Sequence, residues 1–378
     1  LRPLAHSGSV RYSEESDAGR LPSGSSKTTN ASSRRPTHPH GAIGHPRIGI
    51  GREREEVRRA RAARWNHHVM SRLLAIDSPP GGTRAVWVCP ACRGELDWDF
   101  DHSRCQRCQR AFPVWNGIPD LRHGPEDPYL SSDEDRRIAD ELMEHYANED
   151  FGGLLRRLFE LSGVDGERAR QRQLDHILSA PARGEPTLNR LSAGETATNG
   201  WYLDLGCGSG SLLAHAARSR PSQRWIGIDV AWRWLILARK QLQEHGLDQV
   251  PLACAQGERL PLRDGSIAGI LGGDVIEHVA DAPSTIQECH RVLRAGGRLL
   301  LTTPNRFSLT PEPHVGVWGV GWMPRRWMSA YVRWCNGADF RAITTRGERE
   351  WRRLFRASPF GAAVIVPPEI PAEQLARF

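Results

Sequence analysis

A glycine-rich loop and two carboxylates give the sequence its clearest chemistry. Asp204 lies in a short apolar run that leads into three alternating glycines, Gly206, Gly208 and Gly210. Glycine lets a backbone turn sharply and approach a ligand closely. A second apolar run ends in Asp229, where a carboxylate can accept two hydrogen bonds from a ribose diol. The pattern predicts a site for a ribose-containing cofactor at the carboxyl ends of two neighbouring strands.

Three classes of cofactor compete for this loop. A dinucleotide site has the spacing G-x-G-x-x-G, but Ser211 stands where the last glycine is expected. A phosphate-binding loop ends in Lys followed by Ser or Thr, and this pair is absent here. S-adenosylmethionine has no phosphate, and its amino acid end needs polar backbone and a nearby acid. Asp204 can serve there directly or by fixing the loop, so the residues favour S-adenosylmethionine.

The runs D-L-G-C-G-S-G at 204–210 and G-I-D at 227–229 resemble motifs of class I, type 11-like methyltransferases that use S-adenosylmethionine. The run H-R-V-L-R-A-G-G-R-L-L-L at 290–301 is similar to the same family, and the resemblance covers residues 200–306 closely. It implies an enzyme with a Rossmann-like three-layer α/β fold, in which helices cover both faces of a mostly parallel, seven-stranded sheet. The cofactor would lie across the tips of the first, second and fourth strands.

The resemblance implies further cofactor contacts after the third and fourth strands. Gln256 stands where relatives have an acid that contacts the adenine amino group. Its side-chain oxygen can still accept a hydrogen bond from that group. The alternative is that Gln256 is an ordinary loop residue. Gly257 follows, and we expect Leu260 to pack near the adenine. We expect Asp274, a further cofactor contact, and Glu277 to begin a helix, where acids complement the helix dipole.

His278 is the candidate catalytic residue. It lies in the segment D-V-I-E-H-V at 274–279, which is similar to the block after strand four in ubiquinone-type and other small-molecule methyltransferases. There it would act as a general base that removes a proton from an acceptor hydroxyl. The alternative is that His278 only orients the loop, because methyl transfer depends mainly on aligning the methyl group with its acceptor.

Four cysteines in two close pairs predict a structural metal site ahead of this domain. They form C-x2-C, a gap of 12 residues and a second C-x2-C: Cys89, Cys92, Cys105 and Cys108. Two such turns can hold a zinc ion tetrahedrally, which leaves no open position for catalysis. Rubredoxin-type iron is the alternative metal. The unit at 85–122, with a hairpin at 112–119, resembles the zinc-ribbon subunit that activates tRNA and translation-factor methyltransferases, here fused in cis.

Composition divides the rest of the chain. Residues 1–50 are rich in Ser, Pro, Gly, Arg and His without apolar periodicity, and residues 51–75 have the composition of a solvated polar helix; together they predict a disordered basic tail at 1–80. Apolar residues at helical spacing predict a helical lead-in at 132–182, followed by a polar linker at 183–199. We place the methyltransferase core at 200–310 and a lid or substrate region at 311–378.

Charge and hydropathy bear on partners and location. The first 80 residues carry 14 basic and 7 acidic side chains, whereas the rest of the chain carries 37 of each. A neutral folded part makes nucleic acid an improbable though still possible partner. No apolar run reaches the roughly 18 residues that a membrane span needs, and the first segment lacks a secretory apolar core. Paired cysteines without such a signal predict a reducing, cytoplasmic location.

An aromatic segment at 312–334 follows the fifth strand. Its ring side chains alternate with arginines and are Trp318, Trp322, Trp327, Tyr331 and Trp334. We interpret it as a lid over an apolar or lipid-linked acceptor, with contact to a membrane surface possible for such a composition. A hydrophobic cap over the sheet is the alternative. His314 is a candidate substrate contact.

The predicted function is transfer of a methyl group from S-adenosylmethionine to a small or lipid-linked metabolite. The ribbon suggests a tRNA or translation-protein methyltransferase as an alternative. The N-P-P-Y type signature of amino-group methylation is absent, because the fourth strand ends in Gly272-Gly273-Asp274-Val275. A second alternative is a non-catalytic scaffold that binds the cofactor.

Overall fold

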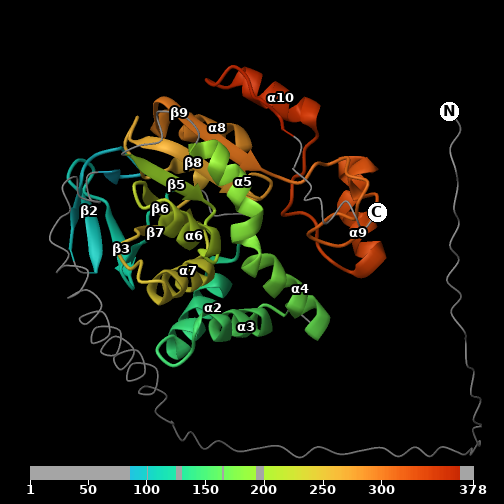
Figure 1. Cartoon of the computed structure of the whole chain (residues 1–378), viewed down its shortest axis with the longest axis horizontal. Coiled ribbons are helices and arrows are strands. Elements are labelled where there is room, and N and C mark those ends of the chain that lie inside the picture. Colours follow the sequence, from blue (N-terminus) through green and yellow to red (C-terminus); the bar gives the residue numbers. More distant parts are fainter. Residues whose placement is uncertain (1–85, 100, 125–129, 164–165, 193–199, 367–378) are drawn as a thin grey trace, which may run out of the picture. The chain divides into compact units, whose positions relative to one another are not determined.

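The computed structural model describes residues 86–99, 101–124, 130–163, 166–192 and 200–366 (Figure 1). All of them belong to one compact unit of the chain, residues 56–378. The predicted disordered tail lies outside the described residues.

Five parallel strands form the central sheet, in the order β7-β6-β5-β8-β9 (Figure 1). Their bounds are β5 Trp201–Leu205, β6 Arg224–Asp229, β7 Leu252–Cys254, β8 Ile267–Gly273 and β9 Leu293–Thr302. The strand order reverses between β5 and β8, and an open α/β sheet binds ligands at such a switch point, beyond the carboxyl ends of its strands.

Helices cover both faces of this sheet, which confirms the Rossmann-like three-layer fold. The crossover helices are α6 Ser211–Ser219, α7 Trp232–Glu244 and α8 Ala282–Val292. Side chains of β5 point alternately to the two faces: Tyr202 packs with residues of α6 and α7, whereas Leu203 packs with residues of α8. The alternation arises because successive strand residues face opposite sides of a sheet.

The prediction of seven strands is wrong for the part of the chain that the structure describes. After β9 the described part of the chain forms helices and loops and adds no strand to the sheet. Two residues of this segment, Asn305 and Arg346, pair with each other in an isolated bridge. Prolines interrupt this stretch repeatedly, and its aromatic residues follow helical rather than alternating spacing. Such a pattern does not support strands, which need period-two alternation and free backbone N–H groups.

The N-terminal unit is a four-stranded antiparallel sheet in the order β1-β2-β3-β4. Its strands are β1 Leu96–Trp98, β2 His102–Cys105, β3 Ala111–Trp115 and β4 Ile118–Pro119. The predicted hairpin is present: Trp115 pairs with Ile118 across a turn in which Asn116 and Gly117 have φ angles of 51° and 69°. Both angles are positive, as a two-residue hairpin turn requires.

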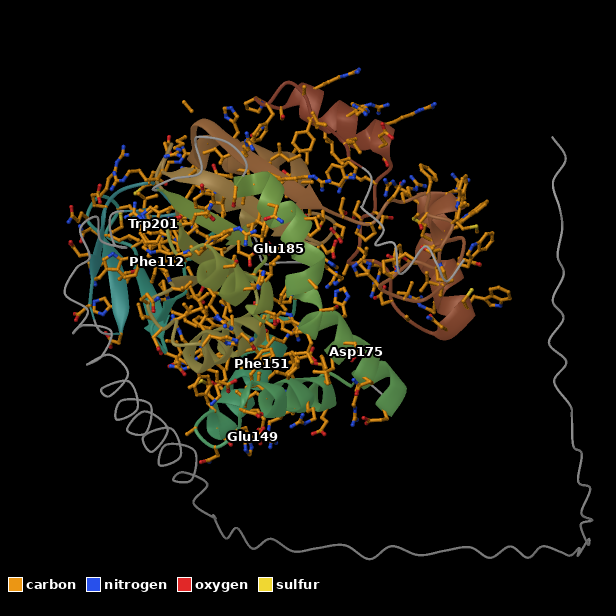
Figure 2. All side chains as sticks on the ribbon, viewed as in Figure 1. Phe112, Glu149, Phe151, Asp175, Glu185 and Trp201 are labelled. Atoms are coloured by element: carbon orange, nitrogen blue, oxygen red, sulfur yellow. The ribbon has the colours of Figure 1, made fainter. Side chains whose placement is uncertain are left out.

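This ribbon is joined to the edge of the parallel sheet. Asp120 bridges Cys254 of β7 in parallel, and Leu121 donates a backbone hydrogen bond of 2.8 Å to the carbonyl of Cys254. Phe112, which Figure 2 labels on the ribbon, is buried together with Leu121 in the same apolar cluster as residues of β5 and β6. Burying each such side chain contributes about 1.5–3 kcal/mol. The ribbon therefore covers the β7 edge and shares a core with the larger domain.

Four helices lead into the sheet: α2 Ser132–His145, α3 Phe151–Leu161, α4 Glu167–Leu178 and α5 Ala180–Ser192. The side chains of Ser131 and Asp150 cap α2 and α3, and both helices pack on α7. The predicted polar linker is wrong over residues 183–192, which belong to α5. Leu188 and Leu191 are buried against the sheet domain. This packing stabilises the helix, although its polar composition and internal proline do not indicate one.

The segment after β9 contains η4 Val320–Trp322, α9 Arg325–Asn336 and α10 Glu348–Ala357. Trp351 of α10 packs on Ala282 and Ile286 of α8. In contrast, η4 and α9 share a small cluster of their own, centred on Val320, Met328 and Val332. Within the described ranges, no helix combines the length and apolarity that crossing a bilayer requires.

Candidate functional site

The glycine loop joins β5 to α6 at the switch point. Gly206, Gly208 and Gly210 have φ angles of 71°, 51° and 78°, which are costly for any residue with a Cβ atom. A Cβ atom on Gly206 would lie 2.4 Å from the Val275 side chain, and one on Gly210 would lie 2.8 Å from the Ala238 backbone. A Cβ atom on Gly208 would meet nothing within 4 Å. Two glycines therefore allow close packing, and the middle one faces open space.

Asp229 at the end of β6 is held by this loop. One carboxylate oxygen accepts the N–H of Gly208 and the other accepts the N–H of Ala231, each at 2.9 Å. Burial raises the pKa of Asp229 to about 6, although both hydrogen bonds favour the ionised form. The carboxylate retains lone pairs for further donors.

Asp204 lies one strand away and is 3% exposed. Among the described residues, its Oδ2 atom has no hydrogen-bond partner. Burial, and then the nearby charge of Asp229, raises the pKa of Asp204 to about 7. A buried carboxyl oxygen without a donor is costly, so a cationic or hydrogen-bonding ligand group beside it would be stabilised.

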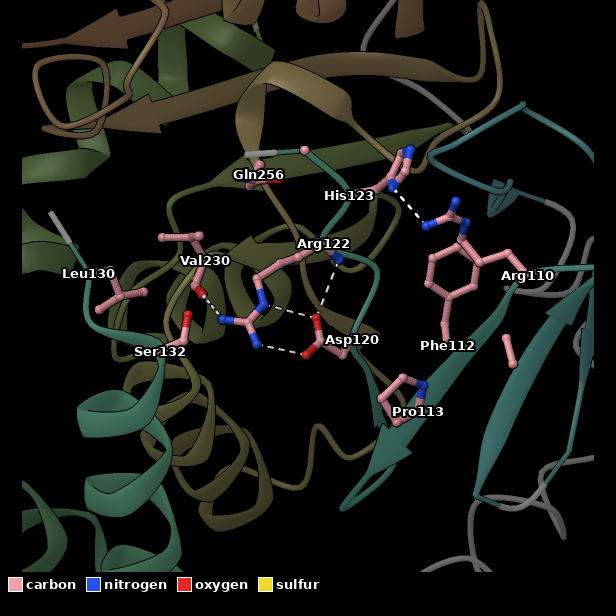
Figure 3. A pocket seen from close by; sticks show the side chains of 12 residues that line it. Arg110, Phe112, Pro113, Asp120, Arg122, His123, Leu130, Ser132, Val230 and Gln256 are labelled. Carbon is pink, nitrogen blue, oxygen red and sulfur yellow. Dashed lines mark hydrogen bonds and ion pairs between the residues drawn. The ribbon is translucent and has the colours of Figure 1, made fainter. Parts of the chain in front are cut away.

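Gln256, Gly257 and Leu260 follow β7. Gln256 lines a cavity of about 430 Å³ together with Val230, which comes directly after Asp229 (Figure 3). Gly257 begins the 3-10 turn η3 (Gly257–Arg259). Leu260 is buried in the core shared with the ribbon, and its N–H donates to Glu288 at 3.0 Å.

The ribbon supplies the other wall of this cavity, which the sequence patterns do not indicate. Asp120 and Arg122 line it and form an ion pair of 2.7 Å (Figure 3). Arg122 also donates to the Val230 carbonyl at 3.4 Å, and the Trp232 ring N–H donates to Asp120 at 3.4 Å. The contacts with Val230 and Trp232 join residues more than a hundred positions apart, so the spacing of residues along the chain does not predict them.

Asp274 and Glu277 occupy a turn after β8, and the prediction that they begin a helix is wrong. Helix α8 begins at Ala282, with Asp281 as its cap, because the Asp281 carboxylate accepts the Ser284 N–H. Asp274 has a φ angle of 51°, and its N–H donates to the Thr302 carbonyl at 3.0 Å. The turn aims Glu277 inward, where it is 1% exposed and burial raises its pKa to about 7.

His278 meets His314 of the C-terminal segment. The two rings stand edge to face with their centres 4.9 Å apart. The Nδ1 atom of His314 lies 2.6 Å from the Glu312 carboxylate, and its Nε2 atom lies 3.9 Å from Glu277. The structure thus brings together the candidate base and the candidate substrate contact, and adds Glu277 and Glu312 to them.

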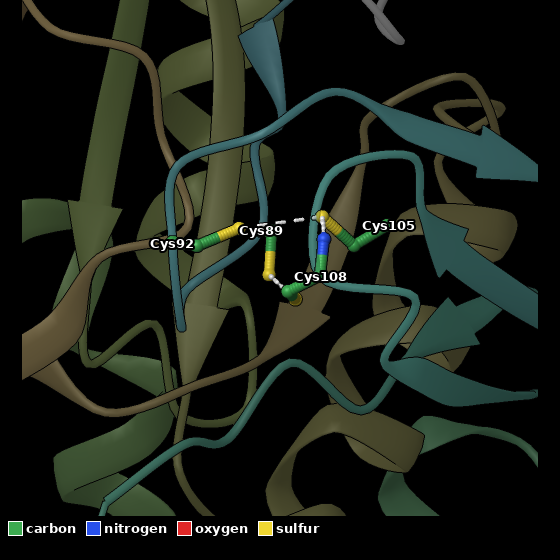
Figure 4. A group of neighbouring side chains, drawn as sticks. All are labelled: Cys89, Cys92, Cys105 and Cys108. Carbon is green, nitrogen blue, oxygen red and sulfur yellow. Dashed lines mark hydrogen bonds between the residues drawn. The ribbon is translucent and has the colours of Figure 1, made fainter.

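The four paired cysteines gather at one end of the ribbon (Figure 4). Their sulfur atoms all lie within 4.8 Å of one another, with Cys89 to Cys108 at 3.7 Å and Cys92 to Cys105 at 3.4 Å. Ligands about 2.3 Å from a tetrahedral zinc ion are roughly 3.8 Å apart. The cluster therefore has the composition and spacing of a structural metal site.

Comparison with known proteins matches residues 203–301 to the methyltransferase domain family. An uncharacterised 37.1 kDa protein in a Streptomyces fradiae transposon is 38% identical over 173 residues, 45% of this chain and 48% of that protein. The ubiquinone biosynthesis O-methyltransferase of Parvibaculum lavamentivorans is 31% identical over 130 residues, 33% of this chain and 49% of that protein. The chain thus spans about half the length of these relatives.

Among solved structures, geranyl diphosphate methyltransferase in complex with its cofactor is 22% identical and matches with a TM-score of 0.38. The match covers 51% of this chain and 70% of that one. The family match coincides with β5 to β9, and it includes the glycine loop, the carboxylates of Asp204 and Asp229 and the turn after β8. Residues 203–301 therefore form a domain of the methyltransferase domain family.

Proposed function

We propose that this chain transfers a methyl group from S-adenosylmethionine to a small or lipid-linked acceptor. The observation that carries the proposal is a pair of carboxyl groups, the buried Asp204 and the half-buried Asp229, on either side of a glycine loop whose middle residue faces open space. These features fit a ligand with an ammonium group at one end and a ribose diol at the other.

Each residue has a distinct part in holding the cofactor. Asp229 would accept both ribose hydroxyl hydrogens, since it already lies at the strand tip with its oxygens fixed by backbone donors. The unpartnered oxygen of Asp204 would face the ammonium group. Gly208 leaves room for close approach, and Val230 and Gln256 would line the adenine end of the site.

Bound S-adenosylmethionine supplies a methyl group on a sulfonium. An acceptor lone pair would take up that methyl group, and the electron pair of the carbon–sulfur bond would stay on sulfur. For a hydroxyl acceptor, a proton must also leave, and His278 is the proposed base that takes it. The turn at Asp274 would orient the acceptor side of the site.

The ribbon is proposed to bind zinc through Cys89, Cys92, Cys105 and Cys108. Four thiolates complete a tetrahedral shell, so this metal would have a structural role. Through Asp120 and Arg122 the ribbon would also fix one wall of the adenine end.

Radiolabelled methyl transfer tests the function. Full-length protein would be incubated with S-adenosylmethionine carrying a tritiated methyl group and, separately, a quinol, a polyprenyl-linked lipid, bulk tRNA and a ribosomal protein fraction. We expect label in an organic-soluble product. Label in tRNA or protein alone would contradict the acceptor class, and the absence of transfer despite cofactor binding would favour a scaffold.

Cofactor affinity should depend on pH through Asp229. Its pKa of about 6 lies above the usual 3.8, so acidification below pH 6 protonates the carboxyl and removes the ribose acceptor. We expect calorimetric affinity to be constant above pH 8, to decline first as Asp204, whose pKa is about 7, is protonated, and to fall at least about tenfold per pH unit below pH 5. Folding responds with the opposite sign: the cost of burying this charge is present above pH 6 and disappears as pH falls toward 4. An affinity that rises in acid would contradict this role.

Helix α9 presents an aromatic and cationic face suited to a membrane surface. Trp327 and Trp334 are 51% and 83% exposed, whereas Met328 and Val332 of the same helix are buried. The helix has no acidic residue, and Arg326 lies over the Trp327 ring at 4.7 Å. Tryptophan and arginine together favour the bilayer interface, which would bring the site to a lipid-linked acceptor.

A double Trp327→Ala and Trp334→Ala variant should bind phosphatidylglycerol vesicles at least ~10-fold more weakly, because two large rings lose their burial in the interface. Co-sedimentation measures the effect. Leu178→Ala, at a 56% exposed position on α4, serves as the control. Equal binding by both variants, or wild-type protein that ignores the vesicles, would exclude this surface as the lipid contact.

A further inference from the structure

A cluster of three potential ligands lies beside the turn after β8. Glu277 and His278 come from that turn, and His314 comes from the segment after β9. One ligand atom from each residue lies within 4.8 Å of the other two. We propose that these three side chains bind a divalent transition-metal cation, at a site separate from the cysteine cluster.

Glu277 gives the first argument for a cation. Its side chain is 1% exposed, and neither carboxylate oxygen has a hydrogen-bond partner among the described residues. Its backbone carbonyl is satisfied by the Thr344 N–H at 2.8 Å, so only the carboxylate is left over. Burying a carboxylate without a compensating partner is costly. A metal ion between Glu277 and the two imidazoles would provide that partner.

Glu312 gives the second argument, because it orients His314 as a ligand. Its carboxylate lies 2.6 Å from Nδ1 of His314 and accepts the backbone N–H groups of His314 and Val315, at 3.0 and 3.2 Å. This arrangement fixes the tautomer in which Nε2 carries the lone pair, and Nε2 is the atom that faces Glu277. Histidines that bind metals usually donate their other ring N–H to a carboxylate in this way.

The ligand set indicates both the kind of metal and its purpose. Two imidazoles and one carboxylate suit zinc, iron, manganese or cobalt, and three protein ligands leave coordination positions open. His278 is exposed, so those positions face outward rather than into the core. Asp274 lies close by, but its carboxylate pairs with Arg183 at 3.8 Å. The positively charged guanidinium of Arg183 therefore lies at the border of the site.

The role of this metal rests on the proposed methyl transfer. The turn after β8 faces the acceptor side of the glycine loop, since Val275 packs against Gly206. A divalent cation there would bind the oxygen atoms of the acceptor and lower the pKa of its hydroxyl group. With the cation bound, His278 would act as a ligand in place of the base proposed above, and the acidified hydroxyl would release its proton to water. We therefore infer an acceptor whose methylated hydroxyl stands beside a second oxygen, so that both oxygens reach the cation.

Cobalt titration of the full chain tests the site without requiring turnover. The ribbon is first loaded with one equivalent of zinc, and Co²⁺ is then added while the visible and near-ultraviolet spectra are recorded. Cobalt held by nitrogen and oxygen gives weak visible bands, whereas cobalt bound to thiolates adds strong near-ultraviolet charge transfer. We expect a second equivalent to bind with visible bands and without charge transfer.

Variants assign the bound cobalt to its ligands. His278→Ala and Glu277→Gln should weaken this second site more than ~100-fold, and Glu312→Gln about 10–100-fold, as expected for an outer-shell partner. His215→Ala is the matched control, because His215 pairs with Glu185 at 2.7 Å outside the cluster. His278 is exposed, so its removal leaves the core intact.

Two outcomes would overturn the inference: binding of a single equivalent, with thiolate spectra, or unchanged affinity in His278→Ala. A cofactor titration on the same samples separates this result from the proposed function. Cofactor binding without the cobalt site leaves methyl transfer standing, whereas cobalt binding without cofactor binding contradicts methyl transfer alone.

Discussion

An Asp229→Ala variant is expected to bind S-adenosylmethionine at least ~100-fold more weakly than the wild-type chain. The ionised carboxylate would accept two ribose hydroxyl hydrogens, and a hydrogen bond to a charged group contributes about 1.5 kcal/mol or more. The change also releases the N–H groups of Gly208 and Ala231, which fix the loop in the ligand-free protein. Calorimetric titration measures the loss.

Asp248→Ala is the matched control for this variant. Asp248 is exposed in the connection from α7 to β7, at the end of the sheet opposite the glycine loop. Its removal should leave the affinity unchanged. If Asp229→Ala retains wild-type affinity while its thermal unfolding is unaltered, the ribose assignment is wrong.

Replacement of a ribbon cysteine should have the largest effect on stability. A Cys105→Ser variant would lack one of four proposed zinc ligands, and a zinc ribbon without metal loses much of its folding free energy. Exposure of Phe112, Leu121 and Val86, which are buried with the sheet, would add a cost of about 5 kcal/mol. We expect a markedly lower unfolding temperature, less than one zinc per chain, and weaker cofactor binding because Arg122 no longer supports the cavity.

The control for this change is Cys335→Ser, which alters an exposed cysteine on α9. It should keep both the zinc content and the unfolding temperature. Full zinc content with unchanged unfolding of Cys105→Ser would show that the four thiols do not form a structural metal site.

The parts of the molecule that sequence reasoning predicted correctly depend on local patterns. The loop at 206–210 needs glycine because the φ angles of its three glycines are positive, and because a Cβ atom on Gly206 or Gly210 would lie within 3 Å of a neighbour. Each C-x2-C pair occupies one turn, and the two turns face each other so that Cys89 lies near Cys108 and Cys92 near Cys105. The five parallel strands follow from short apolar runs separated by helices.

The parts that sequence reasoning missed depend on contacts between distant segments. Helix α5 looks polar, and only packing of Leu188 and Leu191 on the sheet domain reveals its buried side. The missing strands reflect a C-terminal segment that folds into its own helical cluster instead. The wall formed by Arg122 arises from the docking of the ribbon on β7, which no spacing encodes.

The candidate acceptor side was predicted in part. His278 and His314 were each singled out from the sequence, but 35 intervening residues separate them and their contact depends on the turn at Asp274. That turn was expected to be helical because acids favour helix N-termini. Instead, the positive φ of Asp274 and its backbone hydrogen bond to Thr302 form a turn, and this turn directs the Glu277 side chain inward.

Calorimetric titration of S-adenosylmethionine into the full zinc-loaded chain at pH 7.5 tests the central claim most directly. We expect saturable binding at one site per chain, competition by S-adenosylhomocysteine, and affinity that falls in acid. Folded, zinc-loaded protein that releases no heat and shows no thermal stabilisation by the cofactor would contradict it.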